Sequence, residues 1–185
     1  KPTAKPTAKP TAKPTPKPSN LYYLYVELGS YTMMVYGRDS RGDYTVPLRR
    51  IRVAIGRGTM TRPGKYTLGQ KDRWKYFVLD DHFAQYSTKF HDSGLYIHGP
   101  LYHTNDIHDM ITSSYNAIGT QATSGCLRMT TGDAYWIYMN CPAGTVLEIV
   151  RASPRDLEPP PLPPLVDPDE DPTDPLIPQP TAPPE

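Results

Sequence analysis

Cysteine and long apolar runs are both scarce in this chain, and each shortage excludes a class of protein. The 185 residues include two cysteines, Cys126 and Cys141. These are too few for a disulfide scaffold, although one bridge between them could form in an oxidising compartment. No stretch of about 18 apolar residues occurs, so we expect no transmembrane segment in this chain. The first residue is Lys1 rather than Met, so we expect a fragment or processed product whose signal or anchor would lie upstream.

Proline is almost missing from the middle of the chain and is concentrated at its ends. Of the 23 prolines, 19 lie within residues 1–20 or 153–185. Such ends cannot bury enough apolar surface to offset the entropy lost on ordering them, so we expect both to be disordered or extended. We predict a Lys/Pro/Thr repeat linker at 1–20, one folded domain at 21–152, and an acidic, proline-rich tail without a core-forming pattern at 153–185.

The net charge of +1 is unevenly distributed. Residues 1–20 carry +5, residues 153–185 carry −7, and the middle carries +3. The basic residues of the middle are scattered, and the lysines of the first segment have no aromatic residues between them, so we expect no nucleic-acid partner. The first segment fits either a plain polyproline II spacer or one whose lysines contact an anionic polymer such as a cell wall.

Short stretches rich in Tyr, Val, Leu and Ile recur through the middle and predict strands. The predicted strands are Leu21–Leu28, Tyr31–Tyr36, Leu48–Ile55, Trp74–Leu79, Gly94–Ile97 and Thr145–Val150, the last in the interior of a sheet. Gly29 and Ser30 supply a hairpin turn between the first two strands, and Gly56–Gly69 is predicted as a loop. Gly132–Asn140 is predicted as a short helix capped by Thr130 or Thr131, with inward-facing aromatics. The pattern is typical of a mainly β sandwich or barrel-like domain with one or two short helices.

Cys126 lies in the segment Thr123-Ser124-Gly125-Cys126-Leu127-Arg128-Met129, which suits a nucleophile. A thiol attacks as its thiolate, and a nearby imidazole usually produces it. Gly125 permits a backbone in which successive N–H groups point at one spot, as an oxyanion hole requires. Arg128 and the start of the following helix would both favour the thiolate. A buried structural cysteine is the ordinary alternative, and it is our interpretation of Cys141.

His98 is the preferred base among five histidines. It ends the apolar stretch Leu95-Tyr96-Ile97 and precedes Gly99, so its imidazole would lie at a strand end. His103 and His108 lie in polar sequence and are interpreted as loop residues, with His108 as the second candidate for the base.

A metal site is the other interpretation of these histidines. His98, His103 and His108 could be joined by Asp106 or Asp109. Their spacing of five residues matches neither a helix face nor a hairpin pair, and no Cys-x-x-Cys supports it. We therefore expect no metal and no cofactor.

These residues together resemble the signature of the L,D-transpeptidases, the YkuD-like catalytic-domain family. The resemblance rests on Ile97-His98-Gly99 followed by the segment around Cys126. It extends to Thr61-Arg62-Pro63-Gly64-Lys65-Tyr66, Asn116-Ala117-Ile118-Gly119, Asp133-Ala134-Tyr135-Trp136-Ile137-Tyr138 and Gly144-Thr145-Val146. It covers roughly residues 21–150 and implies an L,D-transpeptidase-like β-sandwich.

Two features depart from the usual family pattern. The gap between His98 and Thr123 is longer than usual, which implies an insertion at Pro100–Ser114 that could act as a lid. His108 fits the usual spacing better but lacks the strand-His-Gly context. Ser124 stands where the family often has a second histidine. Because the implied oxyanion donor there is a backbone N–H, we expect little harm to catalysis but different substrate contacts.

The resemblance implies a two-step acyl transfer. His98 deprotonates Cys126 while the Gly99 carbonyl orients the imidazole. The thiolate attacks the peptide bond between residues three and four of a peptidoglycan stem tetrapeptide and expels D-alanine. The N–H groups of Ser124 to Cys126 stabilise the oxyanion, and Arg128 steadies the site or holds a substrate carboxylate. The thioester then reacts with the side-chain amine of a diamino acid on a neighbouring stem and forms a 3–3 cross-link.

The resemblance also implies a setting and two alternatives. A bacterial, extracytoplasmic monomer acting in cell-wall biogenesis and cell shape is expected. An L,D-carboxypeptidase would resolve the same acyl-enzyme with water, and a non-catalytic wall-binding module would keep the fold with an unreactive Cys126.

Overall fold

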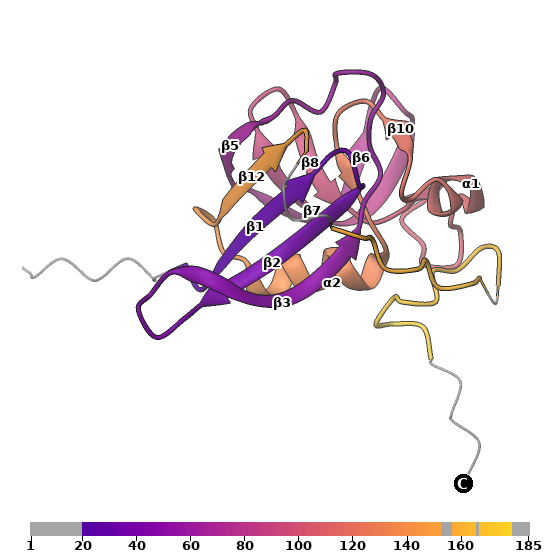
Figure 1. Cartoon of the computed structure of the whole chain (residues 1–185). Coiled ribbons are helices and arrows are strands. Elements are labelled where there is room, and N and C mark those ends of the chain that lie inside the picture. The colour runs from indigo at the N-terminus through magenta and orange to yellow at the C-terminus, as the bar shows by residue number, and fades with distance from the viewer. Residues whose placement is uncertain (1–19, 153–156, 166, 179–185) are drawn as a thin grey trace, which may run out of the picture.

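The computed structural model describes residues 20–152, 157–165 and 167–178 of the chain (Figure 1). The predicted linker at 1–20 therefore lies, apart from Asn20, outside the described residues. In chain order the elements are β1 Tyr22–Glu27, β2 Thr32–Arg38, β3 Tyr44–Arg52, β4 Ile55–Gly56, β5 Gly64–Thr67, β6 Lys71–Phe77, β7 His82–His91, β8 Leu95–His98, β9 Leu101–Tyr102, α1 Thr112–Asn116, β10 Gln121–Thr123, β11 Leu127–Arg128, α2 Thr131–Asn140 and β12 Val146–Val150. Neither described helix has the length and apolar content to cross a membrane.

Most strands belong to two sheets. The first sheet has the order β3-β2-β1-β12-β5, and the second runs β11-β8-β7-β6 with β9 also paired to β7. The predicted hairpin is confirmed, because β1 and β2 pair antiparallel from Tyr22–Gly37 to Glu27–Thr32. The interior position of the last strand is also confirmed, since β12 pairs parallel with β1 and antiparallel with β5. This is the mainly β architecture with short helices that the sequence predicts.

The core is formed by apolar side chains that alternate along these strands. Its fully buried strand residues include Leu24, Val26, Met33, Val35, Ile51, Ile97, Leu127 and Leu147. Each such side chain stabilises the fold by roughly 1.5–3 kcal/mol relative to exposure. Helix α2 adds Ala134 and Ile137 to this core. Thr130 is its N-cap as predicted, because its hydroxyl accepts the N–H of Asp133.

Two strands of four or more residues, one in each sheet, were not predicted. The longest strand, β7, had no predicted counterpart, because the buried side chains of Gln85, Ser87 and Thr88 interrupt its apolar pattern. Strand β5 lies inside the predicted loop Gly56–Gly69, where its exposed residues hide the strand. Strand β7 lies in the interior of its sheet and strand β5 at the edge of its sheet. Pairing with the neighbouring strands holds each of them in place.

The C-terminal segment differs most from its prediction. Residues 157–165 and 167–178 run over the domain beside α1 and α2 (Figure 1). Leu157, Asp171 and Asp174 are buried, and Leu162 and Leu165 pack against the cluster around Tyr102, Met110, Tyr115 and Ile118. The expectation of a tail without a core-forming pattern is therefore wrong for these residues. Isolated leucines and buried carboxylates hold the segment, and neither produces a periodic signal.

Candidate active site

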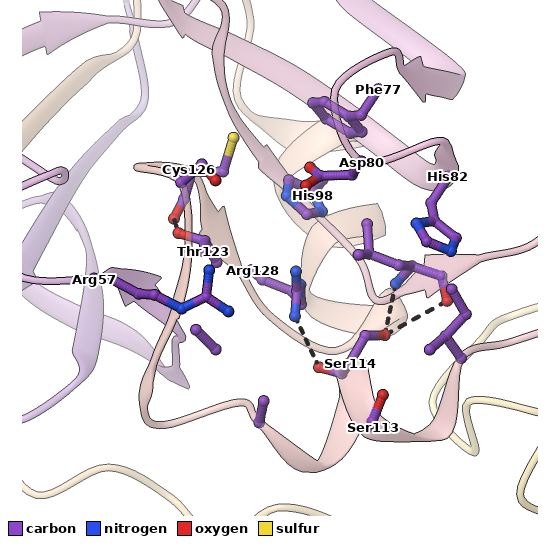
Figure 2. Close-up of a pocket in the computed structure, with 15 residues that line it drawn as sticks. Arg57, Phe77, Asp80, His82, His98, Ser113, Ser114, Thr123, Cys126 and Arg128 are labelled. Atoms are coloured by element: carbon purple, nitrogen blue, oxygen red, sulfur yellow. Dashed lines mark hydrogen bonds between the residues drawn. The ribbon is translucent and has the colours of Figure 1, made fainter.

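The pairing of two short strands brings the predicted catalytic residues together. Strands β8 and β11 pair in parallel, with Ile97 opposite Leu127 and His98 opposite Arg128. Alternate residues of a strand share a face, so Cys126 lies on the same face as Arg128 and His98. The N–H of Tyr96 lies 3.4 Å from the Cys126 sulfur. All three of the predicted side chains line one cavity of about 440 Å³ (Figure 2).

The imidazole of His98 is held in one tautomer. The ring is buried, and its Nδ1 lies 2.6 Å from the carbonyl oxygen of Gly99. A carbonyl can only accept, so Nδ1 carries the hydrogen and Nε2 carries the lone pair. Burial, and to a smaller extent the charge of Arg128, lower the pKa of His98 to about 3 against the opposing effect of the bond to Gly99. The resting imidazole is therefore a neutral base at neutral pH.

The thiol of Cys126 is also neutral at rest. Burial raises the pKa of Cys126 to about 11, against the opposing effects of the Tyr96 N–H and the Arg128 charge. Arg128 favours the thiolate as expected, because its charge lowers the pKa of Cys126, but this effect is the smaller one. Burial outweighs the arginine, and strand β11 separates Cys126 from the start of α2.

A left-handed glycine forms the turn before the nucleophile. Gly125 has φ +120, a conformation that other residues rarely adopt. A Cβ at this position would lie 3.0 Å from a methyl carbon of Leu95 and 3.1 Å from the carbonyl oxygen of Met60. Both the conformation and the space therefore require glycine here.

Two threonine hydroxyls fix the peptide groups of this turn. Thr61 Oγ1 accepts the N–H of Gly56 at 2.7 Å and donates to the carbonyl of Gly125 at 2.9 Å. Thr123 Oγ1 accepts the N–H of Gly125 at 3.2 Å and donates to the carbonyl of Cys126 at 2.7 Å. The Gly125 N–H, which was expected as one of the oxyanion donors, is thus already bound.

The amides of Ser124 and Cys126 remain as donors. The carbonyl of Thr123 accepts the N–H of Arg57 at 3.0 Å, and the carbonyl of Gly125 binds Thr61. In a trans peptide the C=O and N–H point in opposite directions. These two bonds therefore fix the directions of the Ser124 and Cys126 N–H groups, for which no acceptor occurs among the described residues.

Charged side chains of both signs line the cavity. Arg128 is 7% exposed; its Nη1 donates to the Ser114 carbonyl at 3.3 Å, and its buried Nε finds no partner within the described part of the chain. Arg57 lines the same cavity. Asp80, from the turn between β6 and β7, is the one acidic residue among the described residues of the lining. The cavity can therefore bind a carboxylate and an ammonium group.

The predicted insertion forms a wall of the cavity. Leu101, Ile111, Ser113 and Ser114 all belong to the lining, and part of the insertion forms β9 and α1. Ser124 also lines the cavity, and it borders a second hollow of about 490 Å³. Two hollows therefore meet at the turn that carries the nucleophile.

Of the other histidines, His82 also lines the cavity, whereas His103 and His108 do not. His108 is largely exposed, pairs with Glu170 and does not line the cavity. His103 packs against His82, with ring centroids 5.6 Å apart. Within residues 20–152, 157–165 and 167–178, no three His, Cys, Asp or Glu side chains are grouped as metal ligands. Cys126 and Cys141 are both free thiols, and Cys141 is fully buried.

Comparison with known proteins agrees with this geometry. The family model of the YkuD L,D-transpeptidase catalytic domain matches residues 21–149. The chain belongs to this family. YciB of Bacillus subtilis (strain 168), assigned by name to the L,D-transpeptidases, is 28% identical over 129 residues, which are 68% of this chain and 59% of YciB.

Solved structures of L,D-transpeptidases share the fold. LdtMt1, solved in complex with imipenem, superimposes with a TM-score of 0.57 at 17% identity. The match covers 71% of this chain and 59% of the LdtMt1 chain. The L,D-transpeptidase of Mycobacterium smegmatis gives a TM-score of 0.55 at 15% identity, with the same two coverages. This chain therefore spans about three fifths of the length of these relatives.

Three residues of the site escaped the sequence analysis. Thr61 appeared only as part of the family-like turn, without a role. Arg57 and Asp80 lie in a loop and a strand-connecting turn with no motif around them. Only the pairing of distant strands brings them to the cavity, so no local signal identifies them.

Proposed function

We propose that this domain is a peptidoglycan L,D-transpeptidase that works through a thioester on Cys126. The observation that supports the proposal best is the state of His98. Its Nδ1 is bound to Gly99, and its bare Nε2 belongs to the same cavity as the thiol. A neutral base next to a neutral thiol is the resting state that general-base activation of a nucleophile requires.

In the first step, the Cys126 sulfur attacks the carbonyl carbon between residues three and four of a stem tetrapeptide. The thiol proton passes to Nε2 of His98 as the S–C bond forms. The C–N bond then breaks, and the imidazolium returns the proton to the amine of the departing D-alanine. Because burial disfavours both ions, the proton moves together with the attack rather than before it.

The amides of Ser124 and Cys126 supply the oxyanion hole in this proposal. Their directions are fixed by the carbonyl partners on the opposite side of each peptide. Donors that are oriented before the reaction stabilise a developing oxyanion without the cost of reorganisation. The Ser124 side chain is not needed for this role, which agrees with the tolerance expected for serine at this position.

Arg128 and Arg57 bind the carboxylate of the terminal D-alanine. Arg128 is buried with an unpartnered Nε, and leaving such a donor without an acceptor costs free energy. A substrate carboxylate in the cavity supplies that acceptor. The terminal D-alanine is the leaving residue, so this carboxylate and the leaving amine belong to the same residue.

In the second step, the acceptor amine enters where D-alanine left. Its lone pair attacks the thioester carbonyl, His98 Nε2 takes an amine proton, the C–S bond breaks, and the imidazolium protonates the sulfur. Asp80 is the acid of the described lining, and it attracts the ammonium form of the side chain of a diamino acid. The product is the 3–3 cross-link.

The setting of the reaction follows from its substrate. Peptidoglycan lies outside the cytoplasmic membrane, so we propose an extracytoplasmic protein of cell-wall biogenesis. The Lys/Pro/Thr repeat at 1–20 then serves as a spacer through the wall.

Intact-protein mass spectrometry with a stem tetrapeptide tests the proposal. The parent should gain the mass of the stem minus D-alanine, and Cys126→Ala should not. His98→Ala should lose acylation, whereas His108→Ala should keep it; the reverse would reassign the base. A covalent adduct on the Cys126→Ala variant would end the proposal.

The acceptor amine separates the alternatives. With a second stem present, a transpeptidase forms the cross-linked product. Free tripeptide as the only product would identify an L,D-carboxypeptidase. A parent that forms no adduct and whose Cys126 resists both imipenem and iodoacetamide would instead be a wall-binding module.

A further inference from the structure

The C-terminal segment binds the start of helix α2 and strand β7. We call residues 167–177 the strap; they lie beyond the family match, which ends at residue 149. The carboxylate of Asp171 accepts the N–H of Thr131 at 2.6 Å, and Thr173 Oγ1 accepts the N–H of Gly132 at 2.8 Å. Both contacts bind the strap to the first turn of α2. Asp174 reaches further, to strand β7, where it accepts a hydrogen bond from Gln85 Nε2 at 2.6 Å.

The two strap carboxylates end one buried polar network. Gln85 Nε2 donates to the hydroxyl of Tyr102 at 2.8 Å, and the hydroxyls of Tyr102 and Thr131 lie 3.1 Å apart. Asp171, Gln85 and Asp174 are all 0% exposed. The strap supplies both terminal acceptors of this network, and a buried polar network gains rigidity from each partner that it has. Gln85 Oε1 has no hydrogen-bond partner among the described residues.

This network surrounds the residue that orients His98. The N–H of Gly99 donates to the backbone carbonyl of Gln85 at 3.1 Å, and the carbonyl of Gly99 accepts Nδ1–H of His98. On its other side, a Cβ on Gly99 would lie 3.2 Å from Thr131 Oγ1. Gly99 is thus held between Gln85 and Thr131, the two residues that the strap binds.

The backbone next to Gln85 is itself strained. Tyr86 has φ 49, a left-handed conformation in the middle of β7. Such a conformation in a non-glycine residue is strained and persists only where the surroundings impose it. The bond from Asp174 to the Gln85 side chain is one such constraint. It holds the side chain of the residue before the strained position, and the backbone carbonyl of that residue accepts the N–H of Gly99.

We propose that Asp171 and Asp174 are positioning residues for the active site, which act through Thr131 and Gln85 to fix Gly99 and thereby the tautomer of His98. The strap is then part of the catalytic domain and not a linker that follows it. The effect of the strap on the rate of acylation rests on the proposed function, whereas its effect on the tautomer of His98 does not.

The tautomer of His98 gives a direct test. In protein with ¹⁵N-labelled histidine, NMR distinguishes the protonated from the bare ring nitrogen, and the His98 signal is assigned by its loss in His98→Gln. The parent should show protonated Nδ1 and bare Nε2. Asp174→Ala and Asp171→Ala should each show a mixture of both tautomers, because Gly99 loses its fixed position.

The rate of acylation by imipenem is the second readout. A misplacement of about 1 Å costs up to ~100-fold in rate, so both alanine variants should acylate ~10–100-fold more slowly. Asp174→Asn keeps an acceptor oxygen for Gln85 and should stay near the parent in rate and tautomer. The matched control is Glu170→Gln, which alters a strap residue that binds exposed His108 instead of the network; it should leave both readouts unchanged.

The outcomes separate positioning from mere stability. Alanine variants that unfold at lower temperature but keep one tautomer and the parent rate would overturn the proposal. If they fail to fold, Tyr102→Phe removes one hydroxyl from the network, and an unchanged His98 tautomer in that variant would overturn it equally. If imipenem does not acylate the parent, the proposed function fails, and the tautomer comparison still decides the role of the strap.

Discussion

Replacing Thr61 by valine removes one hydroxyl from beneath the oxyanion site and keeps the shape of the side chain. Thr61 is 3% exposed, and its hydroxyl accepts from Gly56 and donates to Gly125. Valine leaves both backbone groups buried without a partner. The peptide between Gly125 and Cys126 then loses the bond that fixes its orientation, and with it the direction of the Cys126 N–H.

The size of the effect follows from these two orphaned groups. Each costs about 1–3 kcal/mol, so the free energy of unfolding should fall by roughly 2–6 kcal/mol. A domain with a stability of about 10 kcal/mol, the middle of the ordinary range, survives that loss. Deleting an oxyanion donor costs about 10²–10³ in kcat. Here the donor is freed rather than deleted, so we expect acylation to slow ~10–100-fold.

Urea denaturation and stopped-flow acylation by imipenem measure the two effects on Thr61→Val. Thr61→Ser is the matched control, because it keeps the hydroxyl and should stay near the parent in both assays. A Thr61→Val protein that loses stability but acylates at the parent rate would refute the reasoning. The Cys126 amide would then either keep its direction without Thr61 or take no part in stabilising the oxyanion.

Three further predictions concern titration and the choice of acceptor. The pKa of His98 is about 3 in the fold against 6.5 as its ordinary value, so the unfolded chain binds the extra proton in that window. Stability should fall as the pH drops from about 6.5 to 3, by at most ~1.4 kcal/mol per pH unit, and urea unfolding of His98→Gln should show a weaker dependence; equal slopes would contradict this. Iodoacetamide should modify Cys126 and spare buried Cys141. The rate of Cys126 modification, followed by mass spectrometry, should rise with pH until the pH reaches about 11. A rate that is already constant above pH 7 would instead show a resting thiolate. Asp80→Asn should lower the ratio of cross-linked to hydrolysed product by ~1.4–5-fold, the value of one weakened charge contact, with the acylation rate near the parent; an unchanged product ratio would remove Asp80 from the acceptor site.

The sequence was informative where structure follows from local pattern. The hairpin of β1 and β2, the Thr130 cap of α2 and the interior strand β12 rest on turn residues, capping chemistry and apolar periodicity. The choice of His98 over His108 rests on a strand followed by glycine, and the cavity that Cys126 lines includes His98 and not His108. Local context therefore distinguished these two histidines.

The sequence failed where long-range polar contacts replace apolar pattern. Strand β7 buries the polar side chains of Gln85, Ser87 and Thr88. The side-chain NH₂ group of Gln85 can be buried because it donates hydrogen bonds to Tyr102 and Asp174, which lie 17 and 89 residues away in the sequence. Such partners cannot be inferred from either segment alone. The strap was missed for the same reason, since its acidic residues indicate solvent exposure unless their donors are known.

The neutral resting states of Cys126 and His98 were not predicted, because the sequence interpretation considered the charge of Arg128 but not the burial of the two side chains. Arg128 does lower the pKa of Cys126, but the desolvation of the thiol is the larger effect. The same burial keeps the imidazole neutral. In the proposed mechanism, neither partner is therefore ionised until an acyl carbonyl accepts the sulfur and the amides of Ser124 and Cys126 bind its oxygen. Reactivity would then depend on a substrate that fills the cavity and pairs with the arginines, a contact that small electrophiles without a carboxylate lack. Under this proposal, a neutral pair is more selective for its substrate than a free thiolate, which reacts with electrophiles in general.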